Sequence, residues 1–307
     1  MKKIFIDGSA DTTGLRILER LKERTDVELI TLSEEDRKDT EKRRVSLNQA
    51  DVAILCLPDA AAIEAADLVE NEKTVIIDTS TAHRTSPGWT YGFPELTGFR
   101  EKIKNSKRIS NPGCHASGFI ALVSPLTEHG LLNKNALLSA FSVTGYSGGG
   151  KKMIADYENG ESENLVSPRV YGISQEHKHL PEMQKYCGLE TCPVFCPTVS
   201  SYYSGMQVVI PLHKKDINGS ADDIKSLYKS YYGGKVIKYA ENPDENGFIR
   251  SDALSGSDKM TVSVLGNGDR ILLVSLFDNL GKGASGAAIQ NLNIVLGADE
   301  YEGLILD

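Results

Sequence analysis

The sequence of 307 residues lacks several features that mark particular protein classes. No stretch approaches the ~18 to 20 apolar residues of a membrane-spanning helix. The apolar stretch before Asp7 is only three residues long, so no signal peptide is expected. The five cysteines are too few and too unevenly spaced for a disulfide framework. A net charge of −8 argues against a nucleic-acid or anionic-membrane surface. We therefore expect a cytoplasmic protein with reduced thiols and with neither nucleic-acid nor membrane partners.

The chain does have an ordinary globular composition, with 40% hydrophobic and 25% charged residues, and its length suits about two domains. In the first third, continuous apolar runs alternate with segments of helical spacing. This pattern is typical of a parallel sheet that helices cover on both faces. Strands are expected at 3–6, 27–32, 51–57 and 74–78, and helices at 15–21 and 60–69.

The rest of the chain has a different pattern. Residues 79–107 are expected to be loops, because Pro, Gly and polar residues interrupt the apolar runs, and a helix is expected at 119–123. Beyond residue 136 the runs have strand composition, and one clear helix at 221–232 interrupts them, which indicates a second, mostly antiparallel sheet. The strands expected there are 137–144, 207–212, 259–265 and 270–277, followed by a last helix at 286–296.

The turn after the first strand reads Gly8-Ser9-Ala10-Asp11-Thr12-Thr13-Gly14. Glycines there let the backbone approach a dinucleotide pyrophosphate, and the following helix start offers amide donors. Only the first and last glycines of the usual G-x-G-x-x-G are present, so a plain strand-to-helix turn is the alternative. After the second strand, Ser33 with Arg37 and Lys38 favours NADP over NAD, although acidic residues stand between the serine and the two cations.

A second motif, Asn111-Pro112-Gly113-Cys114, places a cysteine in the first turn of an expected helix. The positive end of the helix dipole favours a thiolate there, and the backbone amides can hold an oxyanion. Most cysteines are simply buried. Cys56, inside an apolar strand, fits that description, whereas Cys114, in a polar turn, does not.

A third motif contains His177 and His179, two residues apart on a segment expected to be extended, so that both imidazoles share one face. A nucleophilic cysteine needs a base of this kind, and a solvated charged loop is the alternative. Cys187, Cys192 and Cys196 follow, but their spacings match no common zinc pattern. No metal site is predicted.

Two further segments combine lysines with small residues. Tyr146-Ser147-Gly148-Gly149-Gly150-Lys151-Lys152 exposes backbone amides beside two lysines, which suits a phosphate, and a flexible surface hairpin is the alternative. Asp278 to Gly286 places Lys282 before the last helix, which indicates either an anion or cofactor site or a simply capped helix.

Seven motifs, in order, resemble one known family, the N-acetyl-γ-glutamyl-phosphate reductases of arginine biosynthesis in their shorter form. They run from about residue 4 to the end of the chain, and the Asn-Pro-Gly-Cys and His-x-His-x-Pro-Glu pair is specific to that family. Asp11 departs from the family pattern, which has a further glycine in the first motif. The motifs are Gly8 to Gly14, Leu57 to Asp59, Ile77 to Arg84, Tyr91 to Leu96, Asn111 to Cys114, His177 to Glu182 and Lys282 to Gly286.

The resemblance implies an α/β fold with a Rossmann-like parallel-sheet domain and an α+β domain that contains a mostly antiparallel sheet. The last helix is expected to return to the nucleotide domain. The implied domains are therefore 1–113 with 280–307, which binds the dinucleotide, and 114–279, which carries catalysis and oligomerisation. A homo-oligomer, either a dimer or a tetramer, is implied as well.

The resemblance also implies NADPH-dependent reduction of N-acetyl-γ-glutamyl phosphate to N-acetylglutamate 5-semialdehyde, with release of inorganic phosphate. Cys114 would form a thioester, and His179, ahead of His177, would be the acid/base. The alternatives are an acyl-phosphate reductase of the aspartate-semialdehyde dehydrogenase type and a dinucleotide-binding regulator without turnover. The expected NADP(H) contacts are Gly8, Ser9, Thr12, Thr13, Gly14, Ser33, Arg37, Pro58, Ser80 and Asn279, and the expected substrate contacts are Asn111, Arg84, Ser147, Gly148 and Lys151, with Lys152 as a further phosphate candidate.

Overall fold

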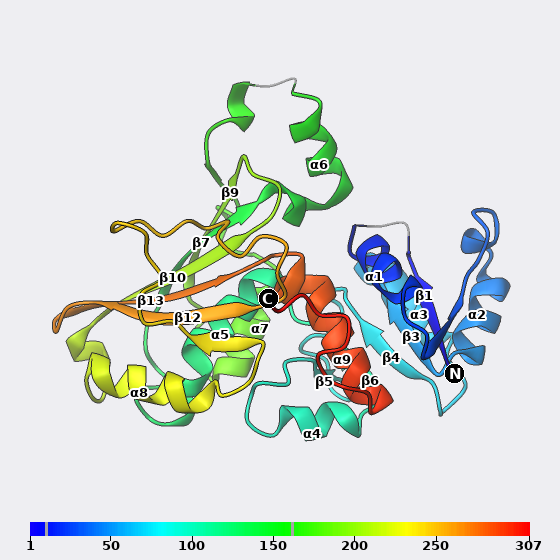
Figure 1. Cartoon of the computed structure of the whole chain (residues 1–307), viewed down its shortest axis with the longest axis horizontal. Coiled ribbons are helices and arrows are strands. Elements are labelled where there is room, and N and C mark those ends of the chain that lie inside the picture. Colours follow the sequence, from blue (N-terminus) through cyan, green and yellow to red (C-terminus); the bar gives the residue numbers. More distant parts are fainter. Residues whose placement is uncertain (10–11, 161–162) are drawn as a thin grey trace. The chain divides into compact units, whose positions relative to one another are not determined.

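The computed structural model describes residues 1–9, 12–160 and 163–307. The chain forms two compact units (Figure 1). Unit 1 consists of Met1–Pro112 with Ala284–Leu304, and unit 2 of Gly113–Gly283 with Ile305–Asp307. No helix among the described residues is long and apolar enough to cross a membrane.

Unit 1 is built on a six-stranded sheet in the order β2-β1-β3-β4-β6-β5 (Figure 1). All neighbouring strands run parallel, as continuous apolar runs predict. The strands are β1 (Lys2–Asp7), β2 (Val27–Ile30), β3 (Val52–Leu55), β4 (Val75–Asp78), β5 (Thr90–Tyr91) and β6 (Arg108–Ser110).

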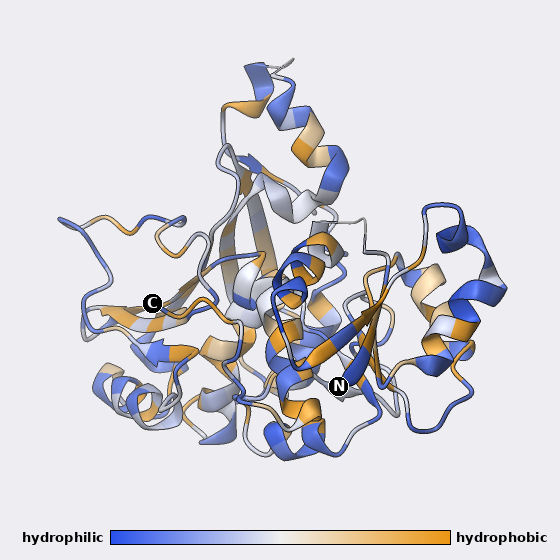
Figure 2. Cartoon of the chain, turned by 45° about the vertical axis from the view of Figure 1, so that its right-hand side comes forward, coloured by the Kyte–Doolittle hydropathy of each residue, from blue (hydrophilic) through white to orange (hydrophobic). Residues whose placement is uncertain are grey.

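Helices cover both faces of this sheet. Ile17 of α1 and Leu292 of α9 are fully buried on one face, and Leu47 of α2 and Ala65 of α3 on the other. In Figure 2 the strands of this sheet are coloured mainly as hydrophobic, whereas the helices carry both hydrophobic and hydrophilic residues. This is the pattern of a helix that buries one face. The helices are α1 (Thr12–Lys22), α2 (Thr40–Gln49), α3 (Asp59–Asp67), α4 (Phe99–Lys104) and α9 (Gly286–Leu296).

The loop prediction for residues 79–107 is wrong in two places, β5 and α4. Both elements are short, and α4 consists mainly of charged residues around a single fully buried side chain, Ile103. Six residues contain too few apolar positions to display a helical period.

Unit 2 contains a seven-stranded sheet in the order β11-β12-β13-β10-β7-β9-β8. Four of its pairs are antiparallel and two, β11 with β12 and β7 with β9, are parallel. The predicted fold class, a Rossmann-like parallel sheet plus a mostly antiparallel sheet, is confirmed. The strands are β7 (Ser139–Gly145), β8 (Arg169–Val170), β9 (Val194–Ser200), β10 (Met206–His213), β11 (Ile237–Tyr239), β12 (Met260–Gly266) and β13 (Arg270–Phe277).

The central helix of unit 2 is α5 (Cys114–Glu128), which is buried from His115 to Leu126. It packs directly on the sheet at Gly118, where a Cβ would lie only 2.6 Å from Val208 and 2.7 Å from Phe277. The expectation of one further helix in this region is wrong, because the described part of unit 2 contains three. They are α6 (Gly150–Glu158), α7 (Leu180–Cys187) and α8 (Ala221–Tyr231).

Candidate functional site

The glycine turn after β1 is held by its own packing. Gly8 has a φ of +86°, and a Cβ there would lie 2.2 Å from the carbonyl oxygen of Cys56. A Cβ on Gly14 would lie 2.5 Å from the carbonyl oxygen of Gly8. A side chain at either position would clash with the backbone, so the turn needs both glycines whether or not a ligand binds there. Thr12 and Thr13 begin α1, and Asp11 lies outside the described residues.

A pocket of about 420 Å³, counted with its open mouth, lies at the carboxyl ends of β1 and β2. Gly8 and Ser9 line it from the turn, Leu18 and Leu29 supply apolar surface, and Arg37 supplies a positive charge. A pocket with both apolar and polar walls and a cation, at the carboxyl edge of a parallel sheet, suits an adenosine that carries a phosphate. Ser33 lies nearby along the chain, exposed, and its hydroxyl accepts the Asp36 N–H at 3.2 Å.

A buried ion pair that the sequence reasoning missed supports this pocket. Asp7, at the end of β1, is 4% exposed, and Arg43, on α2, is 8% exposed. The Arg43 Nη2 lies 2.9 Å from Asp7 Oδ2, and its Nε lies 3.1 Å from the same oxygen. The two residues are 36 positions apart in the chain, and no local sequence pattern predicts a contact over that distance. The contact is seen only in the folded structure.

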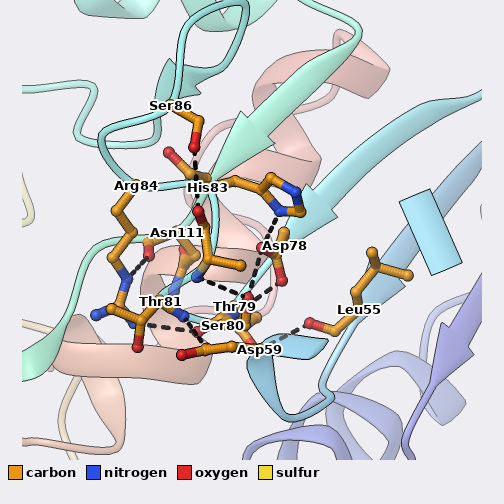
Figure 3. Close-up of polar contacts among 12 residues, drawn as sticks. Leu55, Asp59, Asp78, Thr79, Ser80, Thr81, His83, Arg84, Ser86 and Asn111 are labelled. Carbon is orange, nitrogen blue, oxygen red and sulfur yellow. Dashed lines mark hydrogen bonds and ion pairs between the residues drawn. The ribbon is translucent and has the colours of Figure 1, made fainter. Parts of the chain in front are cut away.

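Asp78, at the end of β4, organises the loop that follows it (Figure 3). Its fully buried carboxylate accepts the Ser80 hydroxyl at 2.7 Å and lies 2.7 Å from His83 Nδ1. The His83 ring in turn stacks on Trp89 with 3.9 Å between ring centres. Ser80, a predicted cofactor contact, is therefore fixed at the carboxyl edge of the parallel sheet, whereas Pro58 is exposed at the start of α3.

Two predicted substrate contacts, Arg84 and Asn111, meet in the same region of unit 1 (Figure 3). The buried Arg84 guanidinium donates to the carbonyl oxygens of Asn111, at 2.9 Å, and Thr79, at 3.1 Å. The Asn111 side chain donates to the Ala284 carbonyl at 2.9 Å. These bonds fix both side chains but also occupy part of their donor capacity.

Cys114 is the first residue of α5, as predicted, and it is partly exposed. Gly113 precedes it with extended dihedrals, and the first bond of the helix runs from the Ser117 N–H to the Gly113 carbonyl at 2.8 Å. First-turn N–H groups of a helix have no acceptor within the helix, so they provide donors beside the sulfur. Gly283 packs against this turn, since a Cβ there would lie 3.0 Å from Cys114 Cβ.

Glu182 connects His179 to the start of α5, because its carboxylate contacts both. The Glu182 carboxylate is 1% exposed, accepts the Gly113 N–H at 3.1 Å and lies 4.0 Å from His179 Nε2. A buried carboxylate at this distance stabilises an imidazolium. The motif thus brings a buried acid, a buried imidazole and the cysteine's helix turn together in unit 2.

The prediction that His177 and His179 lie on an extended segment is wrong. His179 has helical dihedrals (φ −88°, ψ −11°), because it is the N-cap residue of α7. The two rings still lie 4.7 Å apart, and the His179 N–H donates to His177 Nδ1 at 3.2 Å. The turn therefore brings the imidazoles together by a different backbone path from the one expected.

His115 and Tyr171 form a buried network beside these histidines, which the sequence reasoning also missed. His115 Nδ1 lies 2.6 Å from Ser142 Oγ, and its Nε2 lies 2.5 Å from the Tyr171 hydroxyl. Burial, together with the nearby His177, lowers the pKa of His115 to about 3. Burial and the charge of the Cys114 thiolate raise the pKa of Tyr171.

The segment from Tyr146 to Lys152 is not a hairpin, because a 3-10 turn leads directly into α6. Ser147 is buried and accepts a hydrogen bond from the Asn279 side chain at 3.0 Å, whereas Lys151 and Lys152 are exposed. A Cβ on Gly148 would lie 3.5 Å from Asn279 Nδ2. Asn279, a predicted cofactor contact, thus lies in unit 2 beside two of the predicted substrate contacts.

Lys282, the lysine before the last helix, is 1% exposed and lies in a π-helical turn, Gly281–Ser285. Among the described residues, no group of three or more His, Cys, Asp or Glu side chains is arranged to hold a metal ion.

Comparison with protein families matches both parts of the chain. A family described as "Semialdehyde dehydrogenase, NAD binding domain" matches residues 3–106, and one described as "Semialdehyde dehydrogenase, dimerisation domain" matches residues 114–279. Among solved structures, aspartate semialdehyde dehydrogenase II from Vibrio cholerae has a TM-score of 0.74 at 18% identity, covering 97% of this chain and 98% of that chain. This likeness shows a shared fold.

Several proteins are more similar to this chain in sequence than that solved structure is. "N-acetyl-gamma-glutamyl-phosphate reductase 2" of a Nostoc species is 44% identical, with 98% of this chain and 99% of the relative covered. The N-acetyl-gamma-glutamyl-phosphate reductase of Burkholderia orbicola is 42% identical, with 96% and 97% covered. That of Brucella suis is 44% identical, with 96% and 99% covered.

Proposed function

The chain belongs to the N-acetyl-γ-glutamyl-phosphate reductase family, and we propose that it reduces N-acetyl-γ-glutamyl phosphate to N-acetylglutamate 5-semialdehyde with NADPH. Inorganic phosphate is released, and the step belongs to arginine biosynthesis. One observation carries the proposal. Cys114 begins a helix whose N-cap amide is bound by Glu182, and the same carboxylate lies 4.0 Å from His179 Nε2.

In the proposed reaction, the Cys114 sulfur attacks the acyl carbon, the bond from that carbon to the phosphate oxygen breaks, and a thioester forms. His179 accepts the proton of the thiol and gives it to the oxygen of the thiohemiacetal once the thioester carbon has been reduced, with His177 as the alternative. The carbon–sulfur bond then breaks as the hydroxyl proton returns to His179, which releases the aldehyde and regenerates the Cys114 thiolate. The first-turn amides of α5 hold each oxyanion, an effect that contributes about 3 to 4 kcal/mol in other enzymes. When bound, NADPH supplies the hydride that reduces the thioester carbon.

A nicotinamide dinucleotide is supported by the family's first domain, which is described as NAD-binding, and by the pocket in unit 1. Gly8 and Ser9 would hold the pyrophosphate, Leu18 and Leu29 the adenine, and Arg37 a 2′-phosphate. The preference for NADPH is tested with Arg37→Ala. We expect weaker binding of NADPH by about tenfold and unchanged binding of NADH, measured by fluorescence titration. Arg44→Ala, a cation of α2 that does not line the pocket, is the control. Equal loss for both cofactors in Arg37→Ala would contradict this role.

We also propose a homo-oligomer, a dimer or a tetramer, in line with the dimerisation domain named for residues 114–279. The face of the second sheet away from α5 carries exposed apolar side chains, among them Phe141 at 51% and Val194 at 56% exposure. Phe141→Asp should lower the mass measured by light scattering if this face is shared. A cytoplasmic location is supported by the five cysteines, all of which are free thiols.

The reaction itself is tested by NADP⁺ reduction with N-acetylglutamate semialdehyde and phosphate, repeated with NAD⁺ and with aspartate semialdehyde. Cys114→Ser should reduce turnover by at least ~10³-fold, because the covalent route is lost. Cys192→Ser, which changes an exposed thiol, should not alter the rate. Near wild-type turnover in Cys114→Ser would sink the thioester route, and a preference for aspartate semialdehyde would sink the substrate assignment.

A further inference from the structure

His115 lies directly after the proposed nucleophile but points into the protein, where 2% of it is exposed. Both ring nitrogens are engaged, one by the Ser142 hydroxyl of β7 and the other by Tyr171. The rings of His177 and His179 lie 5.6 and 5.7 Å from it, centre to centre. His115 therefore links a rigid strand to the ring cluster at the start of α5.

The hydrogen-bonding atoms of Ser142, His115 and Tyr171 limit which of these residues can donate to which. A neutral imidazole donates from one nitrogen and accepts at the other. If the Ser142 hydroxyl donates to Nδ1, the Nε2–H donates to the Tyr171 oxygen, and the phenol O–H is left to donate to a further acceptor. His115 is neutral at physiological pH and Tyr171 stays protonated there. The relay therefore adds no net charge beside the cysteine.

We propose, on the premise that Cys114 is the nucleophile, that His115 is a positioning residue that holds the Tyr171 hydroxyl as a hydrogen-bond donor to the Cys114 thiolate. His115 directly follows Cys114 in the first turn of α5 and holds the Tyr171 hydroxyl at 2.5 Å, and the Cys114 thiolate is close enough to Tyr171 to raise the pKa of its phenol. A hydrogen bond from a neutral donor to a thiolate stabilises the charged form and therefore lowers the thiol pKa.

Other charged and titratable groups near this end of α5 also act on the thiol. They are His177 and His179 before α7, Glu182 on α7, and Lys282 in the turn that packs on the helix. All four are unchanged in the variants below, so a difference between variants reports the relay alone.

The test is the rate of Cys114 alkylation by iodoacetamide from about pH 5 to about pH 10, followed by peptide mass spectrometry. Tyr171→Phe and His115→Phe should each raise the thiol pKa by about one unit, an approximately tenfold smaller thiolate fraction at pH 7. The double variant should show no larger shift, because the two residues act in series. His115→Gln, which keeps an amide near the Nε2 position, should recover at least half of the shift.

His129→Phe, at the other end of the same helix, is the control and should leave the profile unchanged. If the role of His115 were purely structural, its replacement would lower the unfolding temperature without changing the thiol pKa of Cys114. Thermal unfolding is therefore measured for every variant. An unchanged profile in folded Tyr171→Phe, or additive shifts in the double variant, would overturn the proposal. If His115→Phe does not fold, Tyr171→Phe and His115→Gln decide the question. The assay contains neither NADPH nor acyl phosphate, so its failure is distinct from failure of the proposed reductase activity.

Discussion

The ion pair between Asp7 and Arg43 offers a sharp test of how the nucleotide pocket is supported. Both side chains are nearly buried and share two hydrogen bonds to Asp7 Oδ2, at 2.9 and 3.1 Å. Replacing Arg43 with Met removes the cation and leaves a buried carboxylate without its partner. Breaking a buried pair in this way costs about 3 to 5 kcal/mol of unfolding free energy. Replacing both residues, Asp7→Leu with Arg43→Met, should recover most of that loss, because no charge then remains to be solvated.

The assay is urea unfolding, followed by the fluorescence of Trp89, the single tryptophan, which lies in unit 1. Arg44→Met is the matched control, since Arg44 is the next residue on α2 and pairs with Glu41 and Glu70 at the surface. Surface pairs contribute about 0 to 1 kcal/mol. If Arg43→Met loses no more stability than Arg44→Met, the reasoning from burial is refuted. If the double variant is less stable than Arg43→Met, the unpaired charge of Asp7 is not the cause of the lost stability.

Two further predictions concern stability. The pKa of His115 falls from 6.5 to about 3 on folding, so below pH 6.5 the unfolded chain binds a proton that the native protein does not. This should cost about 1.4 kcal/mol per pH unit down to about pH 3. Urea unfolding at about pH 7.5 and about pH 4.5 should show a larger loss in wild type than in His115→Gln, and equal losses would contradict it. Leu292→Ala, at a fully buried position on α9, should lower the unfolding free energy by about 2 to 5 kcal/mol. Ile63→Ala, at a half-exposed position on α3, should cost less than about 1 kcal/mol, and similar losses would show that α9 does not complete the core.

Patterns that depend on neighbouring residues were predictable from the sequence. The continuous apolar runs predict β1, β3 and β4 because a strand buried on both faces has no polar side to display. The last helix is predicted at its observed bounds, 286–296, because Gly297, with a φ of +68°, ends it in the left-handed conformation that glycine favours. Cys114 is predicted at a helix start for the same local reason, since the Pro-Gly turn fixes where α5 begins.

The histidine loop could not be predicted in the same way, because distant contacts impose its conformation. Gln175 has a φ of +59°, which costs a non-glycine residue of order 1 kcal/mol or more. Its side chain offsets this by donating to the Phe195 carbonyl at 2.8 Å and accepting the Phe195 N–H at 2.9 Å, as a neighbouring strand would. The chain then turns at His179 instead of continuing extended. Local propensity favours neither step, so a segment that is extended by pattern becomes the turn that brings two imidazoles and Glu182 to the start of α5. The residues of this candidate site are therefore readable from the sequence, whereas their arrangement depends on β9, which lies about 20 residues further along the chain.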